Sequence, residues 1–270
     1  VDLSTKPGLT IPEMLTHAHK GDVKLIYIMG ENPMVSDPDT AHVKESLESL
    51  DFLIVQDIFL TETAQLADLV LPASTFAEKD GVFTNTERRV QRVRKAIEPI
   101  GQSKPDWIIL MEIMNRLGYS KVYNNPREIL EEISDLTPSY GGISYERLEG
   151  GGIQWPCPSK DHPGTKYLHK EKFARGLGQF QAIDYVPPVE LPDEEYPLVL
   201  TTGRILYQYH TRTMTDKTEG LTNIAPESFI EMNPDLAREL MVEDGEMVRV
   251  SSRRGEILTK AKVTDTISNN

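Results

Sequence analysis

Side chains suited to binding a polar ligand stand in four short segments of the first half of this 270-residue chain. Asn32 lies in GENP, and its amide can donate and accept hydrogen bonds. Gln56 and Asp57 end an apolar run, so a carboxamide and a carboxylate could bind a purine edge or a ribose hydroxyl. Lys79, in EKDG, is a candidate phosphate-binding cation, and Asp106 stands ahead of a helical pattern. Each also has an ordinary alternative: a turn asparagine, a satisfied turn carboxylate, a solvated lysine and a helix N-terminal acid.

The densest group of hydrogen-bonding side chains lies further on, in the stretch TTGRILYQYHT. Its guanidinium, hydroxyls and backbone N–H groups together suit a pyrophosphate. We expect its histidine to bind rather than to catalyse, because the sequence places no nucleophile or acidic partner beside it. The candidate binding residues of the stretch are Thr202, Gly203, Arg204, Ile205, Leu206, Tyr207, Gln208, Tyr209, His210 and Thr211.

Three apolar, β-prone runs predict the fold around the first group. They span residues 24–30, 52–59 and 69–74, and each has the length of a buried strand. Residues 39–50 have helical spacing behind an N-cap residue, and residues 61–69 begin like a capped helix. This alternation with short connections predicts a mostly parallel sheet covered by helices, with ligands beyond the carboxyl ends of its strands.

The next segments complete a predicted α/β domain over residues 1–137. Residues 82–97 alternate imperfectly, which leaves an extended hairpin and a frayed helix open, and strand pairing is favoured. Residues 104–119 predict a helix closed by glycine, and a shorter helix is expected from Pro126 to about Ser134.

The remainder predicts a crossover and a second domain. Residues 138–195 are rich in Gly, Pro and Tyr and predict a loop-rich crossover, which needs a larger body to lie on. Residues 196–270 predict a small β-barrel domain, with a strand over 197–204, one short helix over 234–241 and two final strands joined at the Arg-Gly pair 254–255.

Composition excludes several classes of partner. The 29 Lys and Arg against 42 Asp and Glu give a formal net charge of −13, so no nucleic acid partner is expected. The single cysteine, Cys157, can form no internal disulfide and cannot hold an iron–sulfur cluster, so we expect it to be structural and expect no metal ligands here. Without an apolar run of about 18 residues we expect no membrane insertion and a cytoplasmic location. Val1 is not a natural initiator, so we expect a segment of a longer protein.

Seven ordered motifs carry a family resemblance across nearly the whole chain. They resemble the C-terminal half of the molybdopterin oxidoreductases that bind bis-molybdopterin guanine dinucleotide (bis-MGD), and most of all the catalytic alpha subunits of formate dehydrogenases. The motifs are GENP, VQDIFLTETAQLADLVLPAS, AEKDGVFTNTERRVQRV, KPDW, IQWPCP, TTGRILYQYHTRTM and MNPDLARELMVEDGEMVRVSSRRGEI.

The resemblance implies a Rossmann-like, mostly parallel α/β domain followed by a double-psi β-barrel that is incomplete at its C-terminus, with both domains clamping the dinucleotide. It also implies that the candidates named above, from Asn32 to Thr211, match dinucleotide-binding positions. An acid such as Asp57 or Asp106 can accept hydrogen bonds from guanine, while Lys79 and Arg204 offset phosphate charge.

The implied reaction is oxidation of formate to CO₂ at a molybdenum or tungsten bis-MGD centre, with two electrons leaving through an iron–sulfur cluster. The cluster motif and the metal's cysteine or selenocysteine ligand belong upstream of Val1, so no catalytic residue is expected in this chain. The implied partners are the rest of the catalytic subunit and electron-transfer subunits carrying iron–sulfur clusters or flavin.

Two alternatives stay open. A nitrate reductase of the same family shares the NP loop, the EK-G turn and a TGR-type loop. A non-catalytic scaffold, such as the large subunit of NADH–quinone oxidoreductase, has a similar fold without a working pterin site. The presence of Lys79, Asp106 and the whole TTGRILYQYHT stretch argues against the scaffold.

Overall fold

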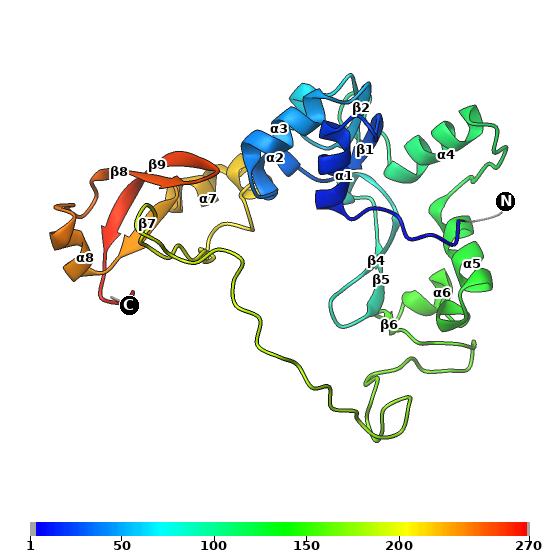
Figure 1. The fold of residues 1–270 in the computed structure, drawn as a ribbon. Coiled ribbons are helices and arrows are strands. Elements are labelled where there is room, and N and C mark those ends of the chain that lie inside the picture. Colours follow the sequence, from blue (N-terminus) through cyan, green and yellow to red (C-terminus); the bar gives the residue numbers. More distant parts are fainter. Residues whose placement is uncertain (1–3, 269–270) are drawn as a thin grey trace. The chain divides into compact units, whose positions relative to one another are not determined.

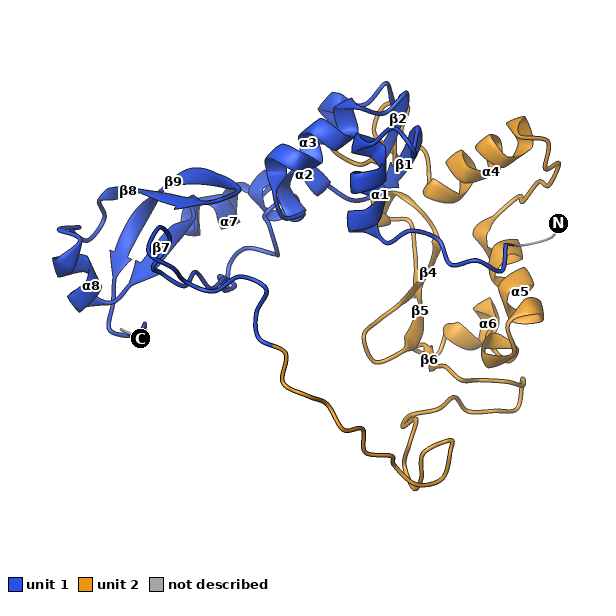
Figure 2. Cartoon of the chain, viewed as in Figure 1, with its two compact units in different colours: residues 1–55, 60–69, 187–270 blue, residues 56–59, 70–186 orange. Residues whose placement is uncertain are grey.

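The chain divides into two compact units, each of which is described by itself (Figures 1 and 2). A computed structural model describes residues 4–268. Unit 1 takes in residues 1–55, 60–69 and 187–270, and unit 2 takes in residues 56–59 and 70–186.

The three predicted strands of the first half form one sheet, in the order β1-β2-β3. Asp68 N donates to Leu53 O at 3.0 Å, and Ala73 N donates to Asp57 O at 3.0 Å. From the first hydrogen bond to the second, the residue number rises on both strands. Strands β2 and β3 are therefore parallel, as the sequence predicts. The strands are β1 (Leu25–Met29), β2 (Phe52–Asp57) and β3 (Leu69–Pro72).

The first part of unit 1 also contains three helices, and two of them, α1 and α2, were not expected from the sequence. Helix α3 is the predicted one, and the Asp39 carboxylate caps it by accepting from His42 N at 3.3 Å. Helix α1 begins with a capping box in which Thr10 N donates to Glu13 Oε2 at 2.7 Å. The helices are α1 (Ile11–His19), α2 (Pro33–Ser36) and α3 (Thr40–Glu48).

The helix predicted over residues 61–69 is wrong, because only a single 3₁₀ turn, η1 (Ala64–Leu66), forms there. Just after the turn, the Asp68 carboxylate accepts from Leu53 N of β2 at 2.7 Å. Tertiary hydrogen bonds to the neighbouring strand therefore override a local helical pattern.

In unit 2 the segment of ambiguous pattern is an antiparallel hairpin, as favoured. Gly81 pairs with Val93, and Val90 pairs with Ile153 on a third strand. The 3₁₀ turn η2 (Phe76–Glu78) precedes the hairpin. The strands are β4 (Gly81–Thr84), β5 (Arg89–Val93) and β6 (Ile153–Gln154).

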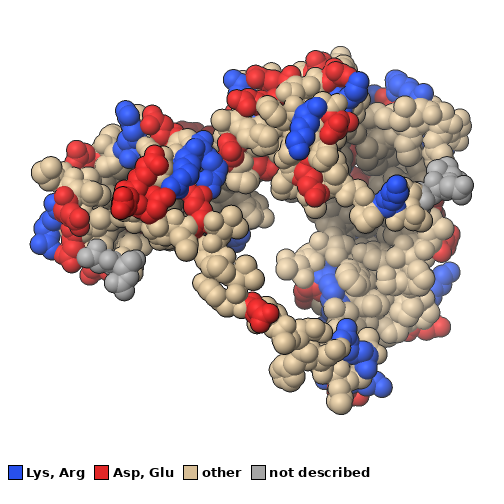
Figure 3. All heavy atoms as spheres, viewed as in Figure 1, with Lys and Arg blue, Asp and Glu red and all other residues tan. Residues whose placement is uncertain are grey.

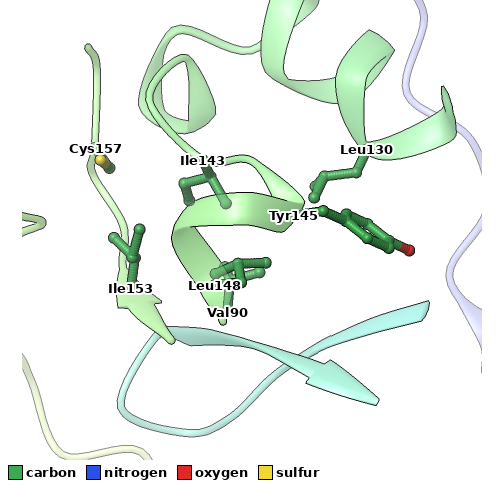
Figure 4. Close-up of a cluster of buried hydrophobic side chains, with 7 residues drawn as sticks. All are labelled: Val90, Leu130, Ile143, Tyr145, Leu148, Ile153 and Cys157. Atoms are coloured by element: carbon green, nitrogen blue, oxygen red, sulfur yellow. The ribbon is translucent and has the colours of Figure 1, made fainter. Parts of the chain in front are cut away.

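The two predicted helices of this region are present, and the second of them contributes Leu130 to a core (Figure 4). Cys157 is fully buried in this core and free, as a structural cysteine would be. Residues 138–157 of the predicted crossover therefore contain packed elements. The elements are α4 (Asp106–Arg116), α5 (Pro126–Leu136), η3 (Pro138–Tyr140) and α6 (Tyr145–Leu148). The core residues are Val90, Leu130, Ile143, Tyr145, Leu148, Ile153 and Cys157.

The last part of unit 1 is a three-stranded sheet of order β7-β9-β8 with a helix against it. Strand β9 pairs parallel to β7 and antiparallel to β8, and Met232, Ala237 and Ala261 form the local core. The predicted helix and the two final strands are confirmed. The elements are η4 (Thr215–Lys217), α7 (Glu219–Ile224), β7 (Phe229–Met232), α8 (Pro234–Glu239), β8 (Met247–Ser252) and β9 (Gly255–Val263).

The strand predicted over residues 197–204 is wrong, because that segment has no regular secondary structure. Leu198, Val199 and Leu200 are 57%, 75% and 64% exposed. A β-prone run becomes a strand only when another strand pairs with it and a surface covers it, and neither is found for this run among residues 4–268. The double-psi topology stays a prediction.

Charged side chains of both signs are intermixed over the face shown in Figure 3. Many are paired: Arg253, for example, makes ion pairs with Glu190 and Asp193. This face therefore lacks the continuous stripe of positive charge that is typical of nucleic-acid-binding proteins. Within residues 4–268, no helix is both long and apolar enough to cross a membrane.

Candidate functional site

Three predicted site residues meet in unit 2 at the side chain of Asp106. Gln56 Nε2 donates to Asp106 Oδ1 at 2.7 Å, and the Lys79 ammonium forms an ion pair with Asp106 Oδ2. Gln56 is fully buried, whereas the side chains of Lys79 and Asp106 are 18% and 33% exposed. The cluster thus has a buried amide at its base and a cation and an anion at its accessible side.

Each member comes from the end of a different element. Gln56 is at the carboxyl end of β2, Lys79 follows the η2 turn, and Asp106 is the first residue of α4. The first backbone N–H groups of a helix have no partner within the helix, and they favour a negative charge there. Asp106 therefore lies where a carboxylate is stabilised.

Asp57 stands next to this cluster and is partly buried. Its Oδ1 accepts from Phe59 N at 3.0 Å. Burial raises the pKa of the Asp57 carboxyl, the backbone N–H groups of Phe59 and Ile58 act in the opposite direction, and the negative charge of Asp106 adds to the rise. A carboxylate that is costly to ionise gains from a ligand that donates hydrogen bonds to it.

A second group of polar residues is centred on Asn32 in unit 1. The Asn32 carbonyl oxygen accepts from Thr63 Oγ1 at 2.7 Å and from Thr63 N at 3.2 Å. Its amide nitrogen donates to Glu62 Oε2 at 2.8 Å and to Thr213 Oγ1 at 3.3 Å. The Asn32 side chain, 5% exposed, thus joins three loops and uses its full hydrogen-bonding capacity within the chain.

The predicted stretch 202–211 is largely exposed, and Gln208 is its buried exception at 6%. Gln208 Nε2 donates to Ala225 O at 2.9 Å, and Thr215 Oγ1 donates to Gln208 Oε1 at 2.5 Å. Gln208 therefore fixes the backbone of the stretch. The rings of Tyr209 and His210 lie edge to face with centroids 4.3 Å apart, and His210 has a φ of 47°.

The structure thus brings Gln56, Lys79 and Asp106 together, with Asp57 beside them in unit 2. Asn32 and residues 202–211 belong to unit 1. No sequence argument identified the partners Glu62, Thr63, Thr213 and Glu78. For Glu78 a signal existed, since Thr75 three residues earlier completes a capping-box pattern, whereas the other three have no local signal.

Metal ligation was not expected of this chain. Among residues 4–268, no three His, Cys, Asp or Glu side chains are gathered as the ligands of a metal ion would be. The first polar group combines an amide, an ammonium and a carboxylate, and the Asn32 group combines an amide, a carboxylate and two hydroxyls.

Comparison with known families gives two matches that together take in most of the chain. A molybdopterin oxidoreductase model matches residues 1–116, and a molydopterin dinucleotide binding domain model matches residues 198–270. The first contains Asn32, Gln56, Asp57, Lys79 and Asp106, and the second contains the stretch 202–211.

Curated relatives match along nearly the whole chain. The F420-dependent formate dehydrogenase subunit alpha of Methanocaldococcus jannaschii is 54% identical over 98% of this chain and 40% of its own length. The F420-dependent formate dehydrogenase 2 subunit alpha of Methanococcus maripaludis is 51% identical over 98% of this chain and 40% of its own length. Formate dehydrogenase H of Escherichia coli is 42% identical over 97% of this chain and 38% of its own length. The chain therefore spans about 40% of the length of these three relatives.

Among solved structures, acetylene hydratase from Pelobacter acetylenicus matches with a TM-score of 0.68 at 20% identity, over 94% of this chain and 37% of that chain. This likeness shows the fold: a mixed α/β chain with a parallel sheet and further small sheets. The family models and the relatives together show that the chain belongs to the molybdopterin oxidoreductase family, as the motifs imply.

Proposed function

We propose that this chain is the part of a formate dehydrogenase catalytic subunit that binds its molybdenum or tungsten bis-MGD cofactor. The support is its similarity, at 42% to 54% identity, to formate dehydrogenases. The observation that carries the binding role is the meeting of Gln56 and Lys79 at Asp106, at the ends of three elements.

The donor set fits a guanine dinucleotide. Guanine presents N–H donors that a carboxylate such as Asp106 or Asp57 accepts, and the Gln56 amide can both donate and accept. The Lys79 ammonium and the exposed Arg204 guanidinium suit the charge of a diphosphate. Asn32 and the other residues of the stretch 202–211 complete the proposed set of contacts.

In this proposal the chain binds and orients the cofactor. When bound, the metal centre supplies the two-electron oxidation of formate to CO₂. Lys79 and Arg204 neutralise phosphate charge, and the Asn32 group holds the loop that carries Thr213. The metal ligand and an iron–sulfur cluster would come from the remainder of a longer subunit, and electrons would pass to subunits carrying iron–sulfur clusters or flavin. The double-psi β-barrel and the cytoplasmic location belong to the same proposal.

The test is made on the natively purified full-length protein. Molybdenum and tungsten are measured by elemental analysis, and GMP is measured after acid hydrolysis of the same sample. We expect about two GMP per metal ion, and reduction of a dye with formate as electron donor. A folded protein with neither metal nor GMP would overturn the proposal in favour of a scaffold. A loaded enzyme that reduces nitrate and leaves formate untouched would overturn the choice of substrate.

A further inference from the structure

Glu78 is a buried carboxylate that the proposed binding role does not use. It immediately precedes Lys79, and only 3% of its surface is exposed. Its Oε2 accepts from Thr75 N at 2.7 Å, and its Oε1 accepts from Ile100 N at 2.8 Å. The carboxylate thus connects the turn ahead of Lys79 to a segment about twenty residues further along the chain.

Backbone hydrogen bonds join the same two segments on either side of Glu78. Ala96 N and Ile97 N both donate to Ala77 O, at 2.7 and 3.1 Å. Ser74 N donates to Lys104 O at 2.9 Å, two residues before Asp106. The segment that leads into Lys79 and the segment that leads into Asp106 are therefore aligned with each other.

A capping function alone does not account for both oxygens of Glu78. The capping box of the η2 turn needs one carboxylate oxygen, which Thr75 N occupies. The second oxygen binds a backbone N–H of the other segment, Ile100 N. Burying a carboxylate costs free energy unless it is fully hydrogen-bonded, so a residue that served only as a cap would be favoured at an exposed position. The Thr75 backbone N–H holds the pKa of Glu78 below its usual range, so the group is ionised at neutral pH.

We infer that Glu78 is a positioning residue, whose carboxylate fixes the two segments so that the Lys79 ammonium lies against the Asp106 carboxylate. This inference rests on the proposed function, in which the fixed Lys79 ammonium is presented to the cofactor's diphosphate. Glu78 itself touches no ligand.

The test measures the pairing of Lys79 directly, in full-length protein made in a host that cannot synthesise molybdopterin. Lysines are labelled by reductive methylation and quantified one by one by mass spectrometry. In the Glu78→Gln variant, where the amide oxygen satisfies one N–H group at a time, we expect Lys79 to be labelled about tenfold faster, as the loss of one charge-assisted hydrogen bond implies. Lys44, which pairs with Glu48 outside the two segments, should keep its rate and serves as the internal control.

Three further measurements make the result decisive. Glu98→Gln, at an exposed glutamate paired with Lys95, is the matched control and should leave Lys79 unchanged. Glu78→Asp keeps the charge but is too short to reach both N–H groups, so it should behave like Glu78→Gln. In natively purified protein, Glu78→Gln should lower the GMP content while the melting temperature of the cofactor-free form stays close to that of the wild type.

The inference would be overturned by an unchanged Lys79 rate, by a parallel rise at Lys44, by full rescue in Glu78→Asp, or by failure of both variants to fold. Wild-type protein without GMP would overturn the proposed function. The labelling result would still decide the role of Glu78.

Discussion

Asp106 holds two different donors at once, a neutral amide and an ammonium, while its side chain remains one-third exposed. A partly exposed ion pair contributes little to stability, so the Lys79 pair is not explained by folding alone. The buried Gln56 amide beneath it fixes the orientation of the Asp106 carboxylate. Such an arrangement costs little to reopen when a ligand exchanges hydrogen bonds with it.

Asp57 provides a pH-dependent prediction at this scale. Its pKa is raised in the folded state, so the folded protein binds more protons than the unfolded chain as Asp57 titrates. Its contribution to stability is complete below the ordinary aspartate pKa and is lost as pH rises through the raised value. Asp57→Asn removes this loss, and its amide oxygen can still accept from Phe59 N. We expect the variant to gain stability over wild type as the pH rises above the ordinary aspartate pKa of about 4, as measured by urea unfolding of the cofactor-free protein.

The matched control is Asp51→Asn, at an aspartate whose side chain is 71% exposed. Its difference from wild type should stay flat over the same pH range. If Asp57→Asn showed an equally flat difference, the pKa of Asp57 would not be raised in the folded protein.

At the level of elements, patterns with their partner close in sequence were predictable. The β4–β5 and β8–β9 hairpins and the capped helix α3 follow from alternation, turn residues and N-cap chemistry. Residues 61–69 and 197–204 were mispredicted because distant parts of the chain decide their structure. In the first segment, the Asp68 carboxylate accepts a hydrogen bond from Leu53 N of β2. The second segment has apolar residues, but no strand among residues 4–268 pairs with it.

The close packing around Cys157 gives a prediction for the elements of unit 2. A Cβ added at Gly142 would lie 2.0 Å from Ser159 O and 2.8 Å from Cys157 Sγ, and backbone atoms cannot move aside cheaply. We expect Gly142→Ala to lower the free energy of unfolding by about 3 kcal/mol, measured by urea denaturation. Gly150→Ala is the control, because a Cβ there meets open space. Equal stability of the two variants would mean that residues 142 and 159 do not pack closely.

Across the whole molecule, the sequence allowed candidate residues to be chosen by type, but it did not show what those residues contact. Asn32 and Gln208 were proposed as ligand-binding side chains, yet both use their amides inside the chain. Whether they also contact a cofactor stays a proposal. The meeting of Gln56, Lys79 and Asp106 could not be derived from residues 50 and 27 positions apart, because their alignment depends on the joined segments ahead of them.

A variant at Arg204 tests cofactor binding of the whole molecule separately from its folding. It is exposed, so Arg204→Ala should leave the melting temperature within about 2 °C of wild type. The same variant should lower the GMP content of the natively purified protein, because a diphosphate-binding cation is lost. Arg175→Ala removes another exposed arginine and should change neither quantity. Full GMP content in Arg204→Ala would remove Arg204 from the proposed site.

Unit 1 combines residues that precede most of unit 2 with residues that follow it, so the parts of unit 1 are synthesised at different times. The hydrogen bond from Asn32 to Thr213 joins residues 181 positions apart. Residues 70–186 of unit 2 emerge before the later part of unit 1 is made, so they can pack first, since domains form as their residues become available. Asn32 can bind Glu62 and Thr63 early, but its hydrogen bond to Thr213 forms only after Thr213 has been translated. The Asn32 group is therefore completed only after residues 70–186 of unit 2 have been synthesised.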